Sequence, residues 1–205
     1  MNDPIFIGLV IAILVLALAI HEAAHAYVAY LCGDTTAKDM GRMTLNPIVH
    51  IDPFLTILLP ALLIMVGAPP FGGAKPVPVN PMNLRHPLRD MMWVALAGPA
   101  SNVLQAVGFE LLRKFVILQG WYEKEDLFVA VMERGILLNL LLAIFNLFPI
   151  PPLDGSAVRE VFLPRGALSW GYRSRPYTIC GLIGIMLLGR GLFEDRDGLT
   201  PDRVV

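Results

Sequence analysis

Three ionisable side chains, His21, Glu22 and His25, follow an almost uninterrupted apolar run from Ile5 to Ile20. Their HExxH pattern places two imidazoles four residues apart, on one face of a helix, where both can bind one zinc ion. Glu22 lies about 100° round the same turn, where it can act as general base on the metal's water. An ionisable side chain near the centre of a bilayer costs about 2.5–3.5 kcal/mol, so three together need a reason. The pattern predicts a zinc hydrolase site inside a membrane.

The composition favours an integral membrane protein. Of the 205 residues, 56% are hydrophobic and 16% are charged, whereas a soluble domain has about 25% charged residues. The length suits one domain, which we expect over 1–193, followed by a polar tail, 194–205. The first apolar run is too long for a signal peptide and has no basic segment before it. Net charge −1 without a basic cluster argues against nucleic acid as a partner.

The apolar stretches predict an all-α bundle of about four to five transmembrane helices. The first helix is expected from Pro4 to about Leu31, long enough to span a bilayer. Further apolar stretches cover 54–68, 91–112, 129–148 and 177–193. Charged residues between Arg113 and Asp126 are interpreted as a loop. The Gly/Pro-rich segment 71–81 cannot be helical and predicts a short extended piece.

A catalytic zinc site usually has three protein ligands and one open position, so the chain must supply one more. The candidates are His50, His86 and the acidic residues. Asp154 stands out because it closes an apolar stretch behind helix-breaking prolines, where a carboxylate faces either water or a metal. Taken alone, Asp154 could equally be a turn residue. His50 is interpreted as a turn residue, with an auxiliary metal or gating role as the alternative, and His86 as solvated.

These motifs together resemble the site-2 protease family of intramembrane zinc endopeptidases. The HExxH box at 21–25 is accompanied by NxxPxPxLDG at 146–155, and GPASN at 98–102 is similar to that family's third recurrent element. The resemblance covers roughly residues 5–160. It implies that Zn2+ is bound by His21, His25 and Asp154, with Glu22 as catalytic base. It also implies that Asn146 and, more weakly, Asn102 contact substrate or steady the reaction's polar atoms.

Some features depart from the family or have simpler explanations. Ala24 stands where many members have glycine, and a PDZ or CBS domain is lacking, which suggests a minimal form. Asn102 and Asn146 could instead be hydrogen-bonding links between helices. Gly98-Pro99 could be an ordinary kink, or could allow close packing against the metal-binding helix. The rival function is a divalent-metal transporter or a metal-binding membrane protein without protease activity, although a second ligand cluster is missing.

The site imposes a topology. His25 and Asp154 each lie toward the C-terminal end of an apolar stretch, so the two helices should run in the same direction. That requires an even number of crossings after the first helix, up to and including the stretch before Asp154, whereas counting all of these stretches as spans gives three: 54–68, 91–112 and 129–148. The first of these is the shortest and contains Pro60. We therefore predict that 54–68 is re-entrant or buried against the bundle.

The positive-inside rule gives an orientation. With four crossings, nine basic residues fall on the side of the site and six on the other, which predicts a multi-pass protein of the cell (inner) membrane with its site toward the cytoplasm. The expected partners are the lipid bilayer and a membrane-protein substrate with a transmembrane helix. In the segment 75–81, Pro76 and Pro78 leave one edge of a strand without donors. Such a strand could pair with an unwound substrate or cover the zinc site, or be a rigid linker. The sequence predicts no oligomeric state.

Overall fold

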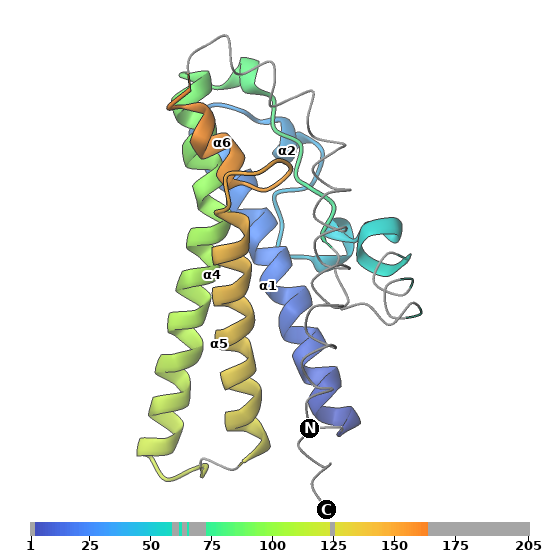
Figure 1. Ribbon diagram of the computed structural model, residues 1–205, viewed down its shortest axis with the longest axis vertical. Helices are drawn as coiled ribbons and strands as arrows, with labels where there is room; N and C mark the ends of the chain where they lie inside the picture. The colour runs from blue at the N-terminus through green and yellow to red at the C-terminus, as the bar shows by residue number, and fades with distance from the viewer. Residues whose placement is uncertain (1–2, 59–61, 63–64, 66–72, 124–125, 164–205) are drawn as a thin grey trace, which may run out of the picture.

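Three long helices form the body of the molecule. The computed structural model describes residues 3–58, 62, 65, 73–123 and 126–163. Helices α1 (Pro4–Leu31), α4 (Pro87–Leu118) and α5 (Leu127–Asn146) lie side by side, and each contacts the other two (Figure 1). Small buried residues such as Ala17, Ala26, Ala95 and Ala106 line their contacts, which lets the helix backbones approach closely.

The bounds of α1 follow from local chemistry, and its predicted range is confirmed. The side chain of Asp3 accepts the N–H of Ile5 at 2.9 Å, and Pro4 occupies the first turn, where its missing N–H costs nothing. At the other end Gly33 has a φ of +110°, a left-handed conformation that glycine adopts without strain. The chain then turns into the short helix α2 (Thr36–Asp39).

The remaining elements are short. They are the 3-10 helices η1 (Pro47–His50) and η3 (Pro81–Asn83), the π-helix η2 (Pro53–Leu58) and helix α6 (Gly155–Glu160). Figure 1 places α2, η3 and α6 at the end of the bundle where α1 ends and α4 begins. The described residues contain no strand, in line with an all-α fold, and 73–80 form no helix, as their prolines predict.

The charged ends of α4 were wrongly excluded from it by the apolar pattern, which predicted 91–112. The helix begins earlier because Asp90 accepts the N–H of His86 at 2.8 Å. It continues to Leu118, through residues expected in a loop, because Glu110 pairs with Arg113 at 2.8 Å and with Lys114 at 3.3 Å. Ion pairs three and four residues apart stabilise a helix where hydropathy gives no signal.

Among the residues that the structure describes, two helices, α1 and α5, are long and apolar enough to cross a membrane. The most apolar 18 residues of α1 are only 17% buried inside the molecule, and those of α5 only 33%. Their exposed faces carry large aliphatic side chains such as Ile11, Leu141 and Ile144. These two helices suggest a membrane protein. The number of spans stays a prediction, and the stretch 177–193 and the tail 194–205 lie outside the described residues.

The directions of the helices agree with the parity argument. In Figure 1, α1 and α5 run toward the same end of the bundle, and α4 runs in the opposite direction. The chain from His50 to Lys75 begins and ends at one place, because the N–H of Lys75 donates to the carbonyl of His50 at 2.7 Å. Within that chain, Thr56 Oγ1 donates to the Gly73 carbonyl at 2.7 Å. A segment that returns to its starting point meets the requirement that 54–68 not cross. Its placement relative to a bilayer stays a prediction, and most of 59–68 lies outside the described residues.

Candidate metal centre

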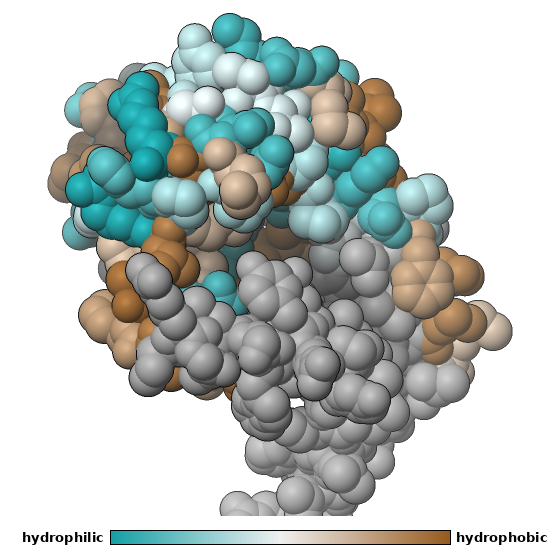
Figure 2. All heavy atoms as spheres, turned by 90° about the horizontal axis from the view of Figure 1, so that it is seen from above, coloured by the Kyte–Doolittle hydropathy of each residue, from teal (hydrophilic) through white to brown (hydrophobic). Residues whose placement is uncertain are grey.

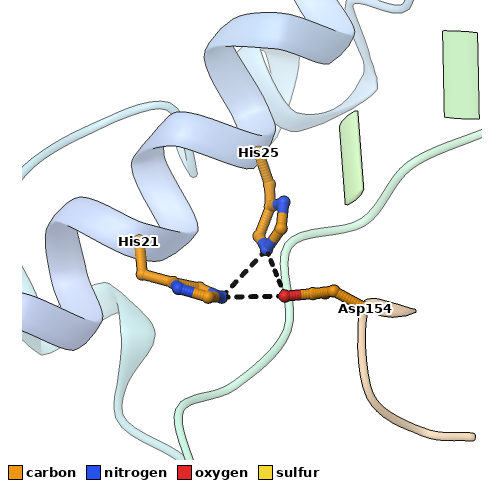
Figure 3. Close-up of side chains that lie close together, drawn as sticks. All are labelled: His21, His25 and Asp154. Carbon is orange, nitrogen blue, oxygen red and sulfur yellow. Dashed lines mark hydrogen bonds and ion pairs between the residues drawn. The ribbon is translucent and has the colours of Figure 1, made fainter. Parts of the chain in front are cut away.

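Three ligand atoms from distant parts of the chain converge on one point (Figure 3). His21 and His25 project from one face of α1, and Asp154 stands directly before α6. The Nε2 atoms of His21 and His25 are 3.0 Å apart. Asp154 Oδ2 lies 3.2 Å from His21 Nε2 and 3.4 Å from His25 Nε2. Among the described residues this is the group of His, Cys, Asp or Glu side chains that could hold a metal ion.

The side chain of Asp154 faces His21 and His25 and does not cap helix α6. It occupies the N-cap position of α6, yet its side chain makes no capping hydrogen bond. Its buried Oδ2 has no hydrogen-bond partner in the described structure. Burial opposes ionisation of the carboxyl, but in the metal-free molecule hydrogen bonds and charge from protonated His21 and His25 rings outweigh burial and lower the pKa of Asp154 to about 2. The carboxylate is therefore charged at neutral pH and faces the two rings.

The donor set fits a zinc ion. His25 Nδ1 lies 2.6 Å from the carbonyl oxygen of Val94, which can only accept, so this Nδ1 carries the proton. His21 Nδ1 lies 2.6 Å from Asn102 Oδ1. In the neutral rings both Nε2 lone pairs then face each other and a carboxylate oxygen, an arrangement that needs a cation. Ligands at ~2.0–2.1 Å from a tetrahedral zinc lie ~3.3–3.4 Å apart, close to the observed separations.

Gly98 lets α4 pass directly over the cluster. A Cβ at this position would lie 2.5 Å from His21 Nε2 and 2.6 Å from His21 Cε1, and would also collide with His25 Nε2. Of the two interpretations of Gly98-Pro99, the structure shows close packing against the histidine helix. Pro99 is accommodated inside α4 without ending it.

Glu22 is held by the segment 73–80. Its Oε2 accepts the N–H of Val77 at 2.9 Å. The segment is tied down on both sides of this contact. On one side the Arg42 guanidinium donates to the carbonyl of Lys75 at 2.8 Å, and on the other the N–H of Asn80 donates to Asp34 Oδ2 at 2.7 Å. The predicted one-sided segment therefore lies against the glutamate of the HExxH box.

Asp34 anchors that segment, a role that the sequence pattern does not predict. The side chain is fully buried after α1, and its Oδ1 accepts the N–H of Thr36 at 3.1 Å and Nδ2 of Asn83 at 3.0 Å. Burial raises the pKa of the carboxyl, but the bonds from Thr36, Asn80 and Asn83 outweigh burial and leave the pKa below its ordinary value. An aspartate after Cys32-Gly33 looks like a turn residue, so no signal in the sequence marked this role.

The two predicted asparagines lie in different surroundings. Asn102 is fully buried and bonds through Oδ1 to His21 and through Nδ2 to Asn139 Oδ1 at 2.9 Å. Asn146 is the last residue of α5, and its Nδ2 donates to the carbonyl of Leu142 at 3.0 Å. A role for either toward substrate stays a prediction. Asn139 was missed, although an amide within an apolar helix is itself a signal.

The other two histidines lie outside the cluster. His50 is buried in η1, and its Nε2 lies 2.9 Å from the carbonyl oxygen of Thr44. His86 is exposed at the N-cap of α4, in line with its interpretation as a solvated residue. An auxiliary role of His50 stays a prediction.

Comparison with known proteins gives the family. The chain is 44% identical over 162 residues to "Putative zinc metalloprotease YwhC" of Bacillus subtilis (strain 168), covering 75% of this chain and 68% of that protein. It is 35% identical over 157 residues to Rip2 of Mycolicibacterium smegmatis, named in the same terms, covering 76% of this chain and 57% of Rip2. It is also 35% identical over 100 residues to MJ0611 of Methanocaldococcus jannaschii, covering 49% and 42%. No protein-family model and no solved structure matches.

The chain is a helical protein in which two histidines and a carboxylate surround one point, and this site defines it as a metal-binding protein. The relatives narrow that class: the chain belongs to the family of zinc metalloproteases that YwhC and Rip2 represent. Zn2+ is accordingly the metal that His21, His25 and Asp154 fit.

Proposed function

We propose that this chain is a zinc-dependent intramembrane endopeptidase of the site-2 protease type. It would cleave peptide bonds in or near the transmembrane segments of other membrane proteins. The observation that carries the proposal is the convergence of His21, His25 and Asp154 at one end of a bundle whose apolar helices are largely unburied. Membership in a zinc metalloprotease family supports the reaction type.

The distribution of polar side chains supports placement in a bilayer. Figure 2 looks onto the end of the molecule that carries α2 and α6, and hydrophilic residues cover much of it, with hydrophobic residues toward its edges. The long helices below it expose apolar residues. We propose that the polar end faces the cytoplasm and that the site lies just inside the membrane boundary. Accessibility labelling at Gly33 and Gly120, in the turns at opposite ends of the bundle, would test this orientation; labelling of both from one side would contradict it.

His21, His25 and Asp154 would hold the zinc ion, leaving one position open. When bound, zinc supplies a water of lowered pKa, about 7, and a Lewis acid for the substrate carbonyl. Glu22 follows His21 on the same turn, and Val77 fixes its Oε2. We assign the other oxygen, Oε1, to take the proton from the attacking water and return it to the leaving amine. Asn146 is proposed to contact the substrate.

The segment 73–80 is proposed to govern how substrate reaches Glu22. A transmembrane helix has its carbonyls already hydrogen-bonded, so it must be unwound and given replacement partners. Val77 donates its N–H to Glu22, and Val79 carries a further N–H group that the neighbouring prolines lack. If Val79→Pro left cleavage of a model substrate unchanged, pairing between this segment and the substrate would be excluded.

The function is tested by zinc content and cleavage of a membrane-inserted model substrate. Wild type should bind zinc and cleave. Glu22→Gln should keep zinc and lose nearly all turnover, since only the proton acceptor is removed. Asp154→Asn should lose zinc, since a charged ligand is removed. Cleavage by Glu22→Gln would overturn the mechanism. Metal uptake into vesicles without cleavage would instead establish the rival transporter.

A further inference from the structure

A chain of buried amides joins the metal cluster to two other helices. His21 Nδ1 lies 2.6 Å from Asn102 Oδ1, Asn102 Nδ2 donates to Asn139 Oδ1 at 2.9 Å, and Asn139 Nδ2 donates to the Gly135 carbonyl at 2.9 Å. Asn102 and Asn139 are both 0% exposed. The links run from α1 through α4 to α5, and each amide uses one oxygen and one nitrogen.

The direction of this chain is set at its far end. The Gly135 carbonyl can only accept, so Asn139 must turn its NH2 group toward it and its Oδ1 toward Asn102. Asn102 must then present its own NH2 group to Asn139 and its Oδ1 to His21. An oxygen at this position requires a proton on His21 Nδ1, which leaves the lone pair of Nε2 directed at the cluster. Each step follows from the one before it.

His25 needs no such relay. Its Nδ1 faces the carbonyl of Val94 directly, and a backbone carbonyl cannot reverse its polarity. The amide of Asn102 could be turned over, presenting NH2 to His21 and moving the ring proton to Nε2, the atom that must bind metal. The bond to Asn139 opposes that reversal, because a turned amide would place an oxygen against Asn139 Oδ1.

We infer that Asn139 is a positioning residue that acts through Asn102 to fix the tautomer of His21, so that Nε2 is available to zinc. The inference rests on the proposed zinc function. Partners of this kind behind a metal-bound histidine are worth about 10–100-fold in metal affinity. The side-chain hydrogen bonds of Asn139 go to Asn102 and to the Gly135 carbonyl, so Asn139 reaches His21 through Asn102.

The test measures zinc affinity of the full-length protein by chelator competition, beginning with Asn139→Leu and Asn139→Asp. The leucine keeps the approximate volume but removes the acceptor for Asn102, so affinity should fall about 10–100-fold. The aspartate retains an oxygen facing Asn102 and should bind zinc more tightly than the leucine variant. A residue that only packs would give the reverse order, because leucine buries no polar group.

A double-mutant cycle distinguishes a loss of zinc affinity that passes through Asn102 from a general loss of stability. In an Asn102→Leu background, adding Asn139→Leu should cause no further loss of zinc affinity, because the relay is already cut. Gln105→Leu, on the same helix three residues from Asn102, is the matched control and should bind as wild type does. Full additivity of the two losses would overturn the inference.

The ring can also be observed directly. In zinc-free protein with neutral imidazoles, 15N shifts of labelled histidine should show His21 protonated at Nδ1 in wild type and in both tautomers in Asn139→Leu. An unchanged tautomer and unchanged affinity in Asn139→Leu would refute the relay while leaving the zinc function intact. Zinc binding that survives His21→Ala and Asp154→Asn would instead refute the proposed function.

Discussion

The HExxH turn of α1 and the Asp154 turn after α5 supply the same cluster but are held in different ways. His21 and His25 are four residues apart on a regular helix, so their common face is set locally, and only the rings need partners. Asp154 instead ends an irregular turn, residues 147–154, whose path depends on tight packing of Gly155 against the backbone of Leu147 and Phe148. Near the histidines, a small added group meets imidazole rings, which can rotate to make room. Near Asp154, it meets backbone atoms, which cannot rotate away.

Gly155→Ala should disrupt the turn that carries Asp154 and have the largest effect on zinc affinity. A Cβ there would lie 2.5 Å from the carbonyl carbon of Leu147 and 2.5 Å from the Phe148 carbonyl oxygen, all backbone atoms. The turn would have to open, at about 1–3 kcal/mol, and carry Asp154 away from the rings. We expect zinc affinity, measured by chelator competition, to fall about 100-fold.

Gly108→Ala is the control for this substitution, because nothing lies within 4 Å of a Cβ at that position of α4. It should bind zinc as wild type does. Wild-type zinc affinity in Gly155→Ala would show that the turn is not held by its backbone packing.

Gly98→Ala should disturb the histidine side and have the second largest effect. Its Cβ would meet imidazole atoms of His21 and His25, which can shift at the expense of their Nδ1 hydrogen bonds. We expect a loss of about 10-fold in zinc affinity and a change in the visible spectrum of the cobalt-substituted protein. A spectrum and affinity equal to those of Gly108→Ala would contradict the close packing of α4 over the rings.

Asp34→Asn should leave both ligand-supplying turns in place, so we expect it to lower stability without lowering zinc affinity. Removing the charge weakens the acceptor for the Asn80 N–H, so thermal unfolding should show about 1–3 kcal/mol less stability, with zinc content unchanged. Because folding lowers the pKa of Asp34 below its ordinary value of 3.8, its contribution is complete above pH 3.8 and is lost as pH falls through the lower folded pKa.

The stability difference between wild type and Asp34→Asn should therefore shrink in acid below about pH 3.8. Asp39→Asn, on the exposed face of α2, should leave stability close to wild type. A loss of zinc in Asp34→Asn would mean that the segment 73–80 also supports the ligands.

The sequence predicted the local features well. The bounds of α1 followed from Pro4 and Gly33, and the pairing of two histidines followed from helical periodicity. Hydropathy underestimated α4, because ion pairs of Glu110 extend the helix beyond its apolar part. The convergence of Asp154 on the histidines followed from the family resemblance and not from spacing, and Asn139 was not foreseen.

The residues themselves determined that one helix would present His21, Glu22 and His25 together, because that geometry repeats every turn without outside help. Only the tertiary structure decided what surrounds them. His21 meets Asn102 across 81 positions of the chain, and Glu22 meets Val77 across 55. Such contacts depend on how separate helices pack and on which way each amide turns. A buried polar atom must find a partner wherever packing supplies one, and no local periodicity encodes that choice.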